Sequence, residues 1–288
     1  MKSMLMGKVA VITGAGQGIG RAIAIHMAAE GAKVVVNDLG VAVDGSGADK
    51  TFADKVTTTI QETGGMAVAN YDDVATVEGG QNIIRAATDN FGRIDILVNN
   101  AGIFRPRLLV EMSEEDWDVT MAVHLKGNFC CTKPAAIAMI RQGSGRIINM
   151  SSGSALGRAG SSNYSASKAG ILGFTWALAR ELGTQGITVN ALFPLARTRM
   201  AKVAVQAEGQ GLKLPGNLAG KQTPDDIAPL VVYLASDQAK DINGWIFSLR
   251  YEGTIELHGE PPAVKGIYSK TKWTLDDLTV AVPNLMSR

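Results

Sequence analysis

A tyrosine and a lysine, Tyr164 and Lys168, stand four residues apart in this chain of 288 residues. On a helix, that spacing places both side chains on one face. A free phenol has a pKa of about 10, and a neighbouring ammonium group favours the phenolate and lowers that pKa. A tyrosine tuned in this way can take a proton from an alcohol or return one to a ketone. The pair therefore indicates a candidate proton-transfer site.

Two adjacent serines, Ser151 and Ser152, precede this pair and follow the apolar run "RIINM" at 146–150. A hydroxyl group there could hydrogen-bond the oxygen atom of a substrate. Successive side chains of a strand point to opposite faces, so only one of the two can face the site. Their order alone leaves Ser151 and Ser152 as alternatives.

A glycine-rich turn, "TGAGQGIG" at 13–20, lies between an apolar run and a helical pattern. Glycine permits the tight turn and lets the backbone approach a pyrophosphate, whose charge then meets the helix N-terminus. Asp38 ends the next apolar run, at the position of an acid that binds the adenosine ribose diol and repels a 2′-phosphate. Since no Arg or Lys stands at 15–17, we predict NAD as the cofactor. The alternative role for Asp38 is to start a turn before Gly40.

Short apolar runs alternate with longer helical patterns along the chain, which is typical of a doubly wound α/β fold. Continuous apolar runs of this length suit strands buried on both faces of a parallel sheet. We predict a single-domain Rossmann-type sheet of about seven strands over residues 1–253. Residues 254–288 break the rhythm and are expected to form a C-terminal extension packed on the same domain, with one short helix capped by Thr274. The expected strands are 8–12, 33–37, 66–70, 95–99, 146–150, 187–192 and 245–249, and the expected helices are 18–30, 48–63, 76–91, 113–141 and 224–236.

The overall charge is near zero, with 28 basic and 27 acidic residues, which argues against nucleic acid or a membrane surface as a partner. No signal-peptide pattern and no apolar run of membrane-spanning length is present. The two cysteines, Cys130 and Cys131, are neighbours that rarely form a structural disulfide, so we expect a reducing, cytoplasmic setting. His26 and His258 have no partners at ligand spacing, and we predict no metal site.

Taken together, these motifs resemble those of the short-chain dehydrogenase/reductase family. The resemblance covers about residues 7–253 and rests on motifs in the family's order. Within the family, segments such as "VVVNDLG" (34–40) and "VHLKG" (123–127) are similar to the dehydrogenase part of peroxisomal multifunctional β-oxidation enzymes and to bacterial single-domain relatives. The matching family motifs are Thr13–Gly20, Asp73-Val74, Asn99–Gly102, the serines, Tyr164 with Lys168, and Pro194 with Thr198.

The resemblance implies a role for each matching residue. Tyr164 is the general acid/base, Lys168 binds the nicotinamide ribose and lowers the pKa of the tyrosine, and a serine hydrogen-bonds the substrate oxygen. Asp73 and Val74 would contact adenine, and Thr198 the nicotinamide carboxamide. The expected cofactor-binding residues are Gly14, Gln17, Gly18, Ile19, Asp38, Asp73, Val74, Asn100, Ala101, Gly102, Tyr164, Lys168, Pro194 and Thr198.

Among the departures from the usual family pattern, two concern the catalytic candidates. The family's count of thirteen residues before the tyrosine falls on Ser151, whereas the framing of "RIINMSS" aligns Ser152. We predict Ser152, because loops absorb deletions more easily than strands do. His124 stands where most of the family has an Asn that organises a water beside the lysine. We count His124 as a catalytic candidate, with a backbone-bonded histidine inside the helix as the alternative.

The resemblance implies oxidation of 3-hydroxyacyl-CoA thioesters with NAD, or of a hydroxysteroid or other cyclic alcohol. A non-catalytic NAD-binding scaffold is the alternative of another class. Arg105 and Arg107 could meet CoA phosphates or pair with acids such as Glu114 and Glu115. Residues 201–222 could form a lid. The helix expected around 167–183 is apolar on more than one side, which favours a homodimer or homotetramer.

Overall fold

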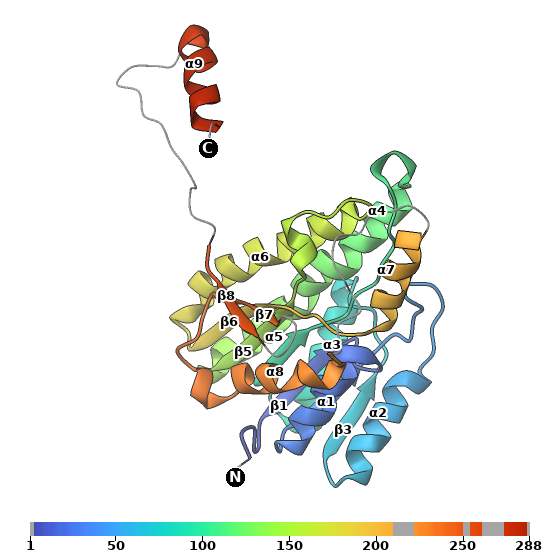
Figure 1. The fold of residues 1–288 in the computed structure, drawn as a ribbon. Coiled ribbons are helices and arrows are strands. Elements are labelled where there is room, and N and C mark those ends of the chain that lie inside the picture. Colours follow the sequence, from blue (N-terminus) through green and yellow to red (C-terminus); the bar gives the residue numbers. More distant parts are fainter. Residues whose placement is uncertain (1–2, 210–221, 250–253, 261–273, 287–288) are drawn as a thin grey trace. The chain divides into compact units, whose positions relative to one another are not determined.

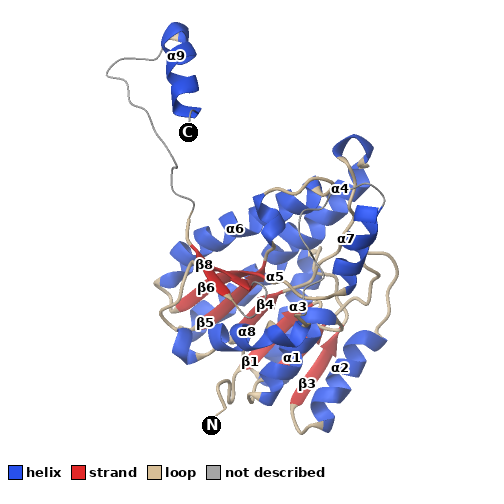
Figure 2. Ribbon diagram, viewed as in Figure 1, coloured by secondary structure: helices blue, strands red, loops and turns tan. Residues whose placement is uncertain are grey.

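The computed structural model describes residues 3–209, 222–249, 254–260 and 274–286. The chain divides into two compact units, residues 1–258 and 259–288. The first unit contains an eight-stranded sheet in the order β3-β2-β1-β4-β5-β6-β7-β8 (Figure 1). All neighbouring strands are parallel except β7 and β8, and helices cover both faces of the sheet (Figure 2). This is the predicted doubly wound Rossmann-type fold.

Seven strands lie where the apolar runs predict them. Alternate residues of each strand pack on opposite faces, so both faces of the sheet need apolar side chains and the sequence reads as a continuous apolar run. Ile12 of β1 packs in one core and Val11 in the other. The strands are β1 (Val9–Thr13), β2 (Lys33–Asn37), β3 (Met66–Asn70), β4 (Ile96–Asn99), β5 (Gly145–Met150), β6 (Ile187–Phe193) and β7 (Ile246–Leu249).

The eighth strand, β8 (Ile255–His258), lies beyond the boundary predicted at residue 253. It pairs antiparallel with β7, and the hydroxyl of Ser248 lies 2.8 Å from Nε2 of His258. The expectation of about seven strands was therefore one strand short. Apolar and polar residues alternate along β8, and Ile255 and Leu257 are exposed, so the strand has no continuous apolar run by which it could be predicted.

Two layers of helices enclose the sheet. The first layer packs against one face through α1 (Gly18–Ala29), α2 (Thr51–Glu62) and α8 (Ala228–Ala235). The second packs against the other face through α3 (Val77–Phe91), α5 (Gly127–Gln142) and α6 (Ser162–Gly183). The carboxyl ends of the parallel strands open between these layers, and β1 has β2 on one side and β4 on the other. A crevice for a ligand is expected at such a switch point.

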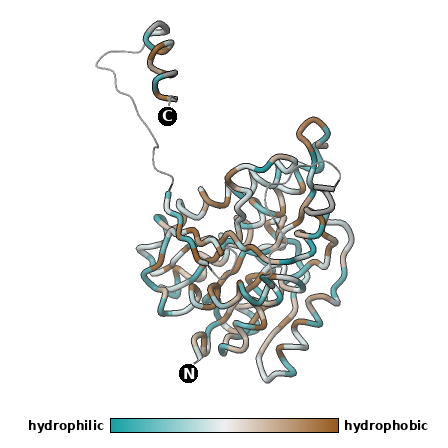
Figure 3. The backbone as a smooth tube through the Cα atoms, in the orientation of Figure 1, coloured by the Kyte–Doolittle hydropathy of each residue, from teal (hydrophilic) through white to brown (hydrophobic). Residues whose placement is uncertain are grey.

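The helix expected over 113–141 is interrupted. It begins as α4 (Glu114–Met121), passes through one π-helical turn at Ala122–Lys126, and continues as α5. His124 lies in the π-helical turn and is completely buried. Such bulges often occur at functional sites. The turn before α4 projects from this unit and is apolar at its tip, where Val110 is 91% exposed (Figure 3).

The predicted lid coincides in part with α7 (Arg199–Gly209), whereas 210–221 lie outside the described residues. In the second unit the structure describes α9 (Leu275–Met286). Its N-terminus is capped as predicted, because the Thr274 hydroxyl accepts a 3.1 Å hydrogen bond from the Asp277 amide. Packing of this extension on the first unit stays a prediction.

Candidate active site

A cavity of about 400 Å³ opens at the carboxyl ends of β1, β2 and β4. All fourteen residues predicted to bind the cofactor lie on its wall, together with His124. They come from the glycine turn, from the ends of β2, β3, β4 and β6, and from α6. The fold therefore gathers these separate motifs around one space, which is the arrangement expected for an extended dinucleotide.

The glycine turn is shaped by close backbone contacts. Gly14 has φ +63°, and a Cβ atom there would lie 2.8 Å from the Cα of Ala101. At Gly20, a Cβ atom would lie 2.2 Å from the carbonyl oxygen of Gly14. Any side chain at these positions would displace backbone, so the turn can approach a phosphate group only with glycine. The N-terminus of α1 follows directly and favours negative charge.

Asp38 fixes the turn from the side of β2. Its Oδ2 accepts a 2.7 Å hydrogen bond from the Gly16 amide, and its Oδ1 accepts one of 2.7 Å from the Gly40 amide. The second bond matches the turn-starting alternative, and the carboxylate also lines the cavity. Because a carboxylate has about four acceptor positions, it retains acceptor capacity for ribose hydroxyls.

Asn99 and Asn100 have different positions. Asn100 lines the cavity, and its Nδ2 donates to the carbonyl oxygens of Thr13 and Gly14 at 2.9 and 3.0 Å. Asn99 is buried, and its amide donates to Thr132 and Asn149. Of the segment 99–102, therefore, Asn99 joins β4 to its neighbours while Asn100, Ala101 and Gly102 face the cavity.

A second cavity of about 440 Å³ adjoins the first. Ile19, Ser151, Tyr164, Pro194, Thr198 and Met200 line both cavities. Ser152 lines only the second, whose wall combines apolar side chains such as Leu156 and Phe193 with polar ones such as Arg158. The Tyr164 side chain thus stands at the junction, where a group bound in one cavity would meet a group bound in the other.

The two serines have separate partners. Ser151 is buried, and its hydroxyl donates a 2.8 Å hydrogen bond to the carbonyl oxygen of Lys168. Ser152 Oγ accepts a 3.1 Å bond from the Ser154 amide and also hydrogen-bonds the Tyr164 phenol. Ser152 therefore lies beside the tyrosine hydroxyl, whereas the Ser151 hydroxyl is turned toward the backbone of α6.

Lys168 is buried at the base of the site. Its Nζ donates a 2.6 Å hydrogen bond to the carbonyl oxygen of Met150 and lies 5.5 Å from the centroid of the Tyr164 ring. Burial lowers the pKa of Lys168 to about 7. Burial raises the pKa of Tyr164, while the hydrogen bond with Ser152 and the charge of Arg158 act in the opposite direction. The sequence predicted a lowered pKa for Tyr164 through the charge of Lys168. In the structure the pKa is raised, because the effect of burial is larger than that of the groups that favour the phenolate, and the charge that favours the phenolate comes from Arg158.

His124 faces the same site from the π-helical turn. Its Nε2 lies 2.8 Å from the carbonyl oxygen of Ile103, and its ring meets the Tyr164 ring edge-on at 5.1 Å. Burial, and then the charge of Lys168, lower the pKa of His124 well below its ordinary value, so the ring is neutral near pH 7. Its Nδ1 is buried without a hydrogen-bond partner among the described residues. The backbone bond matches the alternative role, and the position on the cavity wall matches the catalytic one.

Several cavity residues lie outside the sequence motifs. Val41, Ala42, Val43 and Gly45 come from the loop after β2, whose unusual length is its only sequence signal. Arg199 comes from α7, and its guanidinium lies 5.8 Å from the centroid of the Phe52 ring. The prediction of NAD from the sequence rested in part on the lack of a cation at 15–17, whereas α7 places the positively charged Arg199 on the wall of this cavity from a distant part of the chain.

Arg105 takes the ion-pair alternative. Its Nη1 lies 3.0 Å from Glu115 Oε1 and 3.5 Å from Asp116 Oδ1. Among the described residues, no group of three or more His, Cys, Asp or Glu side chains could hold a metal ion. No helix in the described parts of the chain is long and apolar enough to cross a bilayer.

Comparison with known proteins gives consistent matches. A family model described as short chain dehydrogenase matches residues 8–209. Peroxisomal multifunctional enzyme type 2 of Mus musculus is 42% identical over 257 residues, which cover 86% of this chain and 33% of that protein, so the chain spans about a third of its length. (2S)-[(R)-hydroxy(phenyl)methyl]succinyl-CoA dehydrogenase subunit BbsD of Thauera aromatica is 40% identical over 251 residues, 84% of this chain and 94% of that one. A crystal structure of a short chain dehydrogenase from Mycobacterium avium is 40% identical, with a TM-score of 0.84 over 98% of this chain and 95% of that one.

Proposed function

Because the chain belongs to the short-chain dehydrogenase/reductase family, an oxidoreductase family that binds a nicotinamide dinucleotide, we propose that it interconverts a secondary alcohol and a ketone with NAD. The observation that carries the proposal is the position of Tyr164, whose side chain lines both the cavity of the predicted cofactor residues and the adjoining one. The fit to a dinucleotide rests on the glycine turn, where a Cβ atom would fill the space. A scaffold would need only this nucleotide half of the site.

In the proposed mechanism, the Tyr164 phenolate takes the hydroxyl proton of the alcohol, and Ser152 holds the substrate oxygen by a hydrogen bond. A nicotinamide dinucleotide bound by the residues of the first cavity would supply the acceptor for the hydride that leaves the carbinol carbon. Lys168 ties the end of β5 to α6 and holds the tyrosine over the junction. His124 would bound the site with a neutral ring and a backbone-anchored geometry. The reverse direction returns the proton from Tyr164 to the ketone oxygen.

Replacement of the phenol hydroxyl tests this proposal. We expect Tyr164→Phe to lower kcat by roughly 10²- to 10⁴-fold while NADH binding persists, because the ring still packs against Phe104 and His124. Tyr233→Phe, on α8 and partly exposed, is the control and keeps full activity. Substantial turnover by the Tyr164 variant would refute the mechanism.

The preference for NAD rests on Asp38, which would place a carboxylate beside the adenosine ribose and repel a 2′-phosphate. Arg199 is the opposing charge on the same cavity wall. We expect initial rates with NAD to exceed those with NADP, and Asp38→Ser to reduce the difference. Arg199→Gln should leave the preference for NAD in place. A clear preference of the wild-type enzyme for NADPH would overturn this assignment.

We propose a 3-hydroxyacyl-CoA thioester as the substrate. The support is the name of the Thauera relative, a dehydrogenase of a hydroxylated succinyl-CoA, together with the apolar side chains of the second cavity, such as Leu156 and Phe193, which suit an acyl chain. Arg105 is paired with Glu115 and gives no support to phosphate binding. NADH formation from 3-hydroxyacyl-CoAs of several chain lengths, compared with hydroxysteroids and other cyclic alcohols, tests the choice. Turnover of a cyclic alcohol alone would favour the other substrate class.

We also propose a reducing, cytoplasmic setting and a homodimer or homotetramer. Cys130 and Cys131 are both free and buried, in keeping with a reducing compartment. Phe129, Ile137 and Ile140 of α5 expose 44%, 46% and 42% of their surface and share one helix face, which suits self-association. On α6, by contrast, Ile171 and Leu172 are buried. Mass measurement in solution with and without Ile137→Lys would test the assembly.

A further inference from the structure

The loop after β2, residues 39–49, forms part of the cofactor cavity and is here called the cofactor loop. Its bend is closed by a 2.8 Å hydrogen bond from the Ala42 amide to the Ser46 carbonyl oxygen. Asp44 accepts hydrogen bonds from both the amide and the hydroxyl of Ser46. These bonds shape the loop internally but do not hold it against the rest of the protein.

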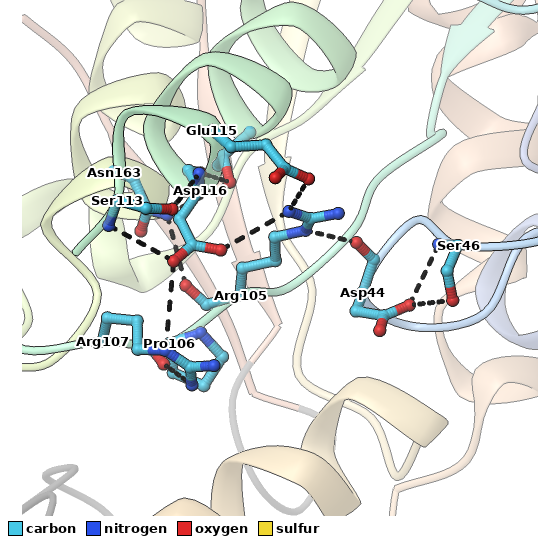
Figure 4. A network of polar contacts seen from close by, with 10 residues as sticks. Asp44, Ser46, Arg105, Pro106, Arg107, Ser113, Glu115, Asp116 and Asn163 are labelled. Atoms are coloured by element: carbon cyan, nitrogen blue, oxygen red, sulfur yellow. Dashed lines mark hydrogen bonds and ion pairs between the residues drawn. The ribbon is translucent and has the colours of Figure 1, made fainter. Parts of the chain in front are cut away.

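The segment 103–105, after β4, makes that outer attachment. The Phe104 amide donates a 2.7 Å hydrogen bond to the carbonyl oxygen of Val43. The Arg105 Nε donates one of 2.6 Å to the carbonyl oxygen of Asp44 (Figure 4). Val43 also packs in one apolar cluster with Phe104 and Tyr164. The cofactor loop is thus fastened to Phe104, which packs against Tyr164, and to the neighbouring Arg105.

The same arginine reaches the other side of the site. Its Nη1 donates to Glu115 Oε1 at 3.0 Å and lies 3.5 Å from Asp116 Oδ1, so the guanidinium joins the cofactor loop to the start of α4 (Figure 4). Asp116 belongs to the capping box that begins this helix. A planar guanidinium carries donors that point in fixed directions, so it can bond two partners at once. A lysine ammonium is a compact charge without this fixed geometry. The side chains of Arg105 and Asp116 are only 18% and 15% exposed, whereas that of Glu115 is 72% exposed.

Asn163 continues the connection to Tyr164. This buried side chain donates to the carbonyl oxygens of Arg105 and Asp116 at 3.2 and 2.9 Å (Figure 4). Its Oδ1 accepts a 2.7 Å hydrogen bond from the amide of Tyr164. In addition, the Phe104 ring meets the Tyr164 ring edge-on at 5.2 Å. Two short paths therefore lead from the cofactor loop to the tyrosine, one through packing and one through hydrogen bonds.

We propose that Arg105 is a positioning residue that couples the cofactor loop to Tyr164, so that binding of the dinucleotide orders the proton-transfer group. Nucleotide in the cavity would contact the cofactor loop, and Arg105 would transmit that ordering to α4 and, through Asn163, to the N-terminus of α6. The physical basis is that one guanidinium group bonds both the cofactor loop and α4, so a nucleotide that orders the loop also favours the ordered position of α4. The inference depends on binding of a nicotinamide dinucleotide and is independent of the substrate.

Hydrogen exchange with NADH as the probe tests this coupling. In the wild-type protein, saturating NADH should slow amide exchange both in peptides covering 41–48 and in peptides covering 161–168. In Arg105→Gln, the effect at 161–168 should become clearly smaller but not vanish, because the packing of Val43 with Phe104 remains. The dissociation constant for NADH, from fluorescence titration, should rise by about 3- to 30-fold. Arg105→Lys should recover only part of the effect, because one ammonium does not reproduce the fork.

Arg107→Gln is the matched control, since this neighbouring arginine is more exposed and lies 3.9 Å from Asp116 Oδ2. It should keep the wild-type NADH affinity and both exchange responses. If Arg105→Gln does not fold, Glu115→Gln, which retains the bond to Asp44, carries the test with a smaller effect in the same direction. A wild-type response at 161–168 in the Arg105 variants, or unchanged NADH affinity, overturns the proposal. If the wild-type protein binds NADPH and not NADH, the NAD assignment fails, and NADPH serves as the probe for the coupling.

Discussion

The ammonium group of Lys168 donates a 2.6 Å hydrogen bond to the carbonyl oxygen of Met150, the last residue of β5. The bond holds α6 against the end of the strand from which the serines emerge. The lysine is almost completely buried, and burial lowers its pKa to about 7 from an ordinary value of 10.5. Burial therefore disfavours the charged form of Lys168, whose Nζ lies 5.5 Å from the centroid of the Tyr164 ring.

Replacement of this lysine should change how stability depends on pH. Below pH 7 the ammonium is charged in both the folded and the unfolded chain, so the folded state bears the full free-energy cost of burying the charge. Between about pH 7 and 10 the unfolded chain binds more protons than the folded one, so the free energy of unfolding rises with pH. Lys168→Met removes this dependence. The free energy of unfolding of the variant relative to the wild type should therefore fall by roughly 4 kcal/mol from pH 6 to pH 10.

Urea denaturation at a series of pH values measures this difference. Lys55→Met, at an exposed position of α2, serves as the control and should follow the wild-type curve. Parallel curves for the wild type and Lys168→Met would contradict the buried, low-pKa lysine.

The pH profile of alcohol oxidation should report Tyr164. Because burial raises the pKa of the phenol and the reaction needs the phenolate, kcat/KM should rise about tenfold per pH unit on its acid limb. Arg158→Gln removes a charge that lowers the pKa of Tyr164, so the limb should move to higher pH. Arg141→Gln, at an exposed position of α5, should leave the limb in place. A limb that moves to lower pH in the Arg158 variant would show the assignment to be wrong.

The two serines should separate by activity and stability. We expect Ser152→Ala to lower kcat by roughly 10²- to 10³-fold, because its hydroxyl lies beside the Tyr164 phenol and would hold the substrate oxygen. Ser151→Ala loses the hydrogen bond to the Lys168 carbonyl and should cost about 1 kcal/mol of stability. Steady-state kinetics and thermal unfolding of both variants distinguish these effects. A greater loss of kcat in Ser151→Ala would reverse the assignment.

The close approach at Gly20 should make that position intolerant of a methyl group. Gly20→Ala would place a Cβ atom 2.2 Å from the Gly14 carbonyl oxygen and 2.5 Å from Asn100 Nδ2, which opens the glycine turn. NADH titration should show at least a roughly tenfold loss of affinity, equivalent to about 1.4 kcal/mol. Gly173→Ala is the matched control, since a Cβ atom there on α6 meets nothing within 4 Å. It should bind NADH normally and gain about 1 kcal/mol of stability from helix propensity. Equal NADH affinity of the two variants would contradict the role of the turn.

The sequence by itself determined the fold and the set of motifs. Seven strands could be predicted from continuous apolar runs, because helices cover both faces of the sheet and the strands therefore carry apolar side chains on both faces. The glycine turn, Asp38 and the pair Tyr164 and Lys168 could be read from spacing, since each acts through local backbone geometry. β8 could not, because its alternating exposed residues lack that pattern.

Only the tertiary structure decided which side chains meet across the site. Strand alternation left Ser151 and Ser152 open, whereas packing of α6 on β5 turns Ser151 to the Lys168 carbonyl and leaves Ser152 beside the phenol. Arg199 reaches the cofactor cavity from α7, and Arg105 bonds Asp44, 61 residues away in sequence. The direction of the Tyr164 pKa likewise depends on burial, which is a property of the folded surroundings and has no signal in residue spacing.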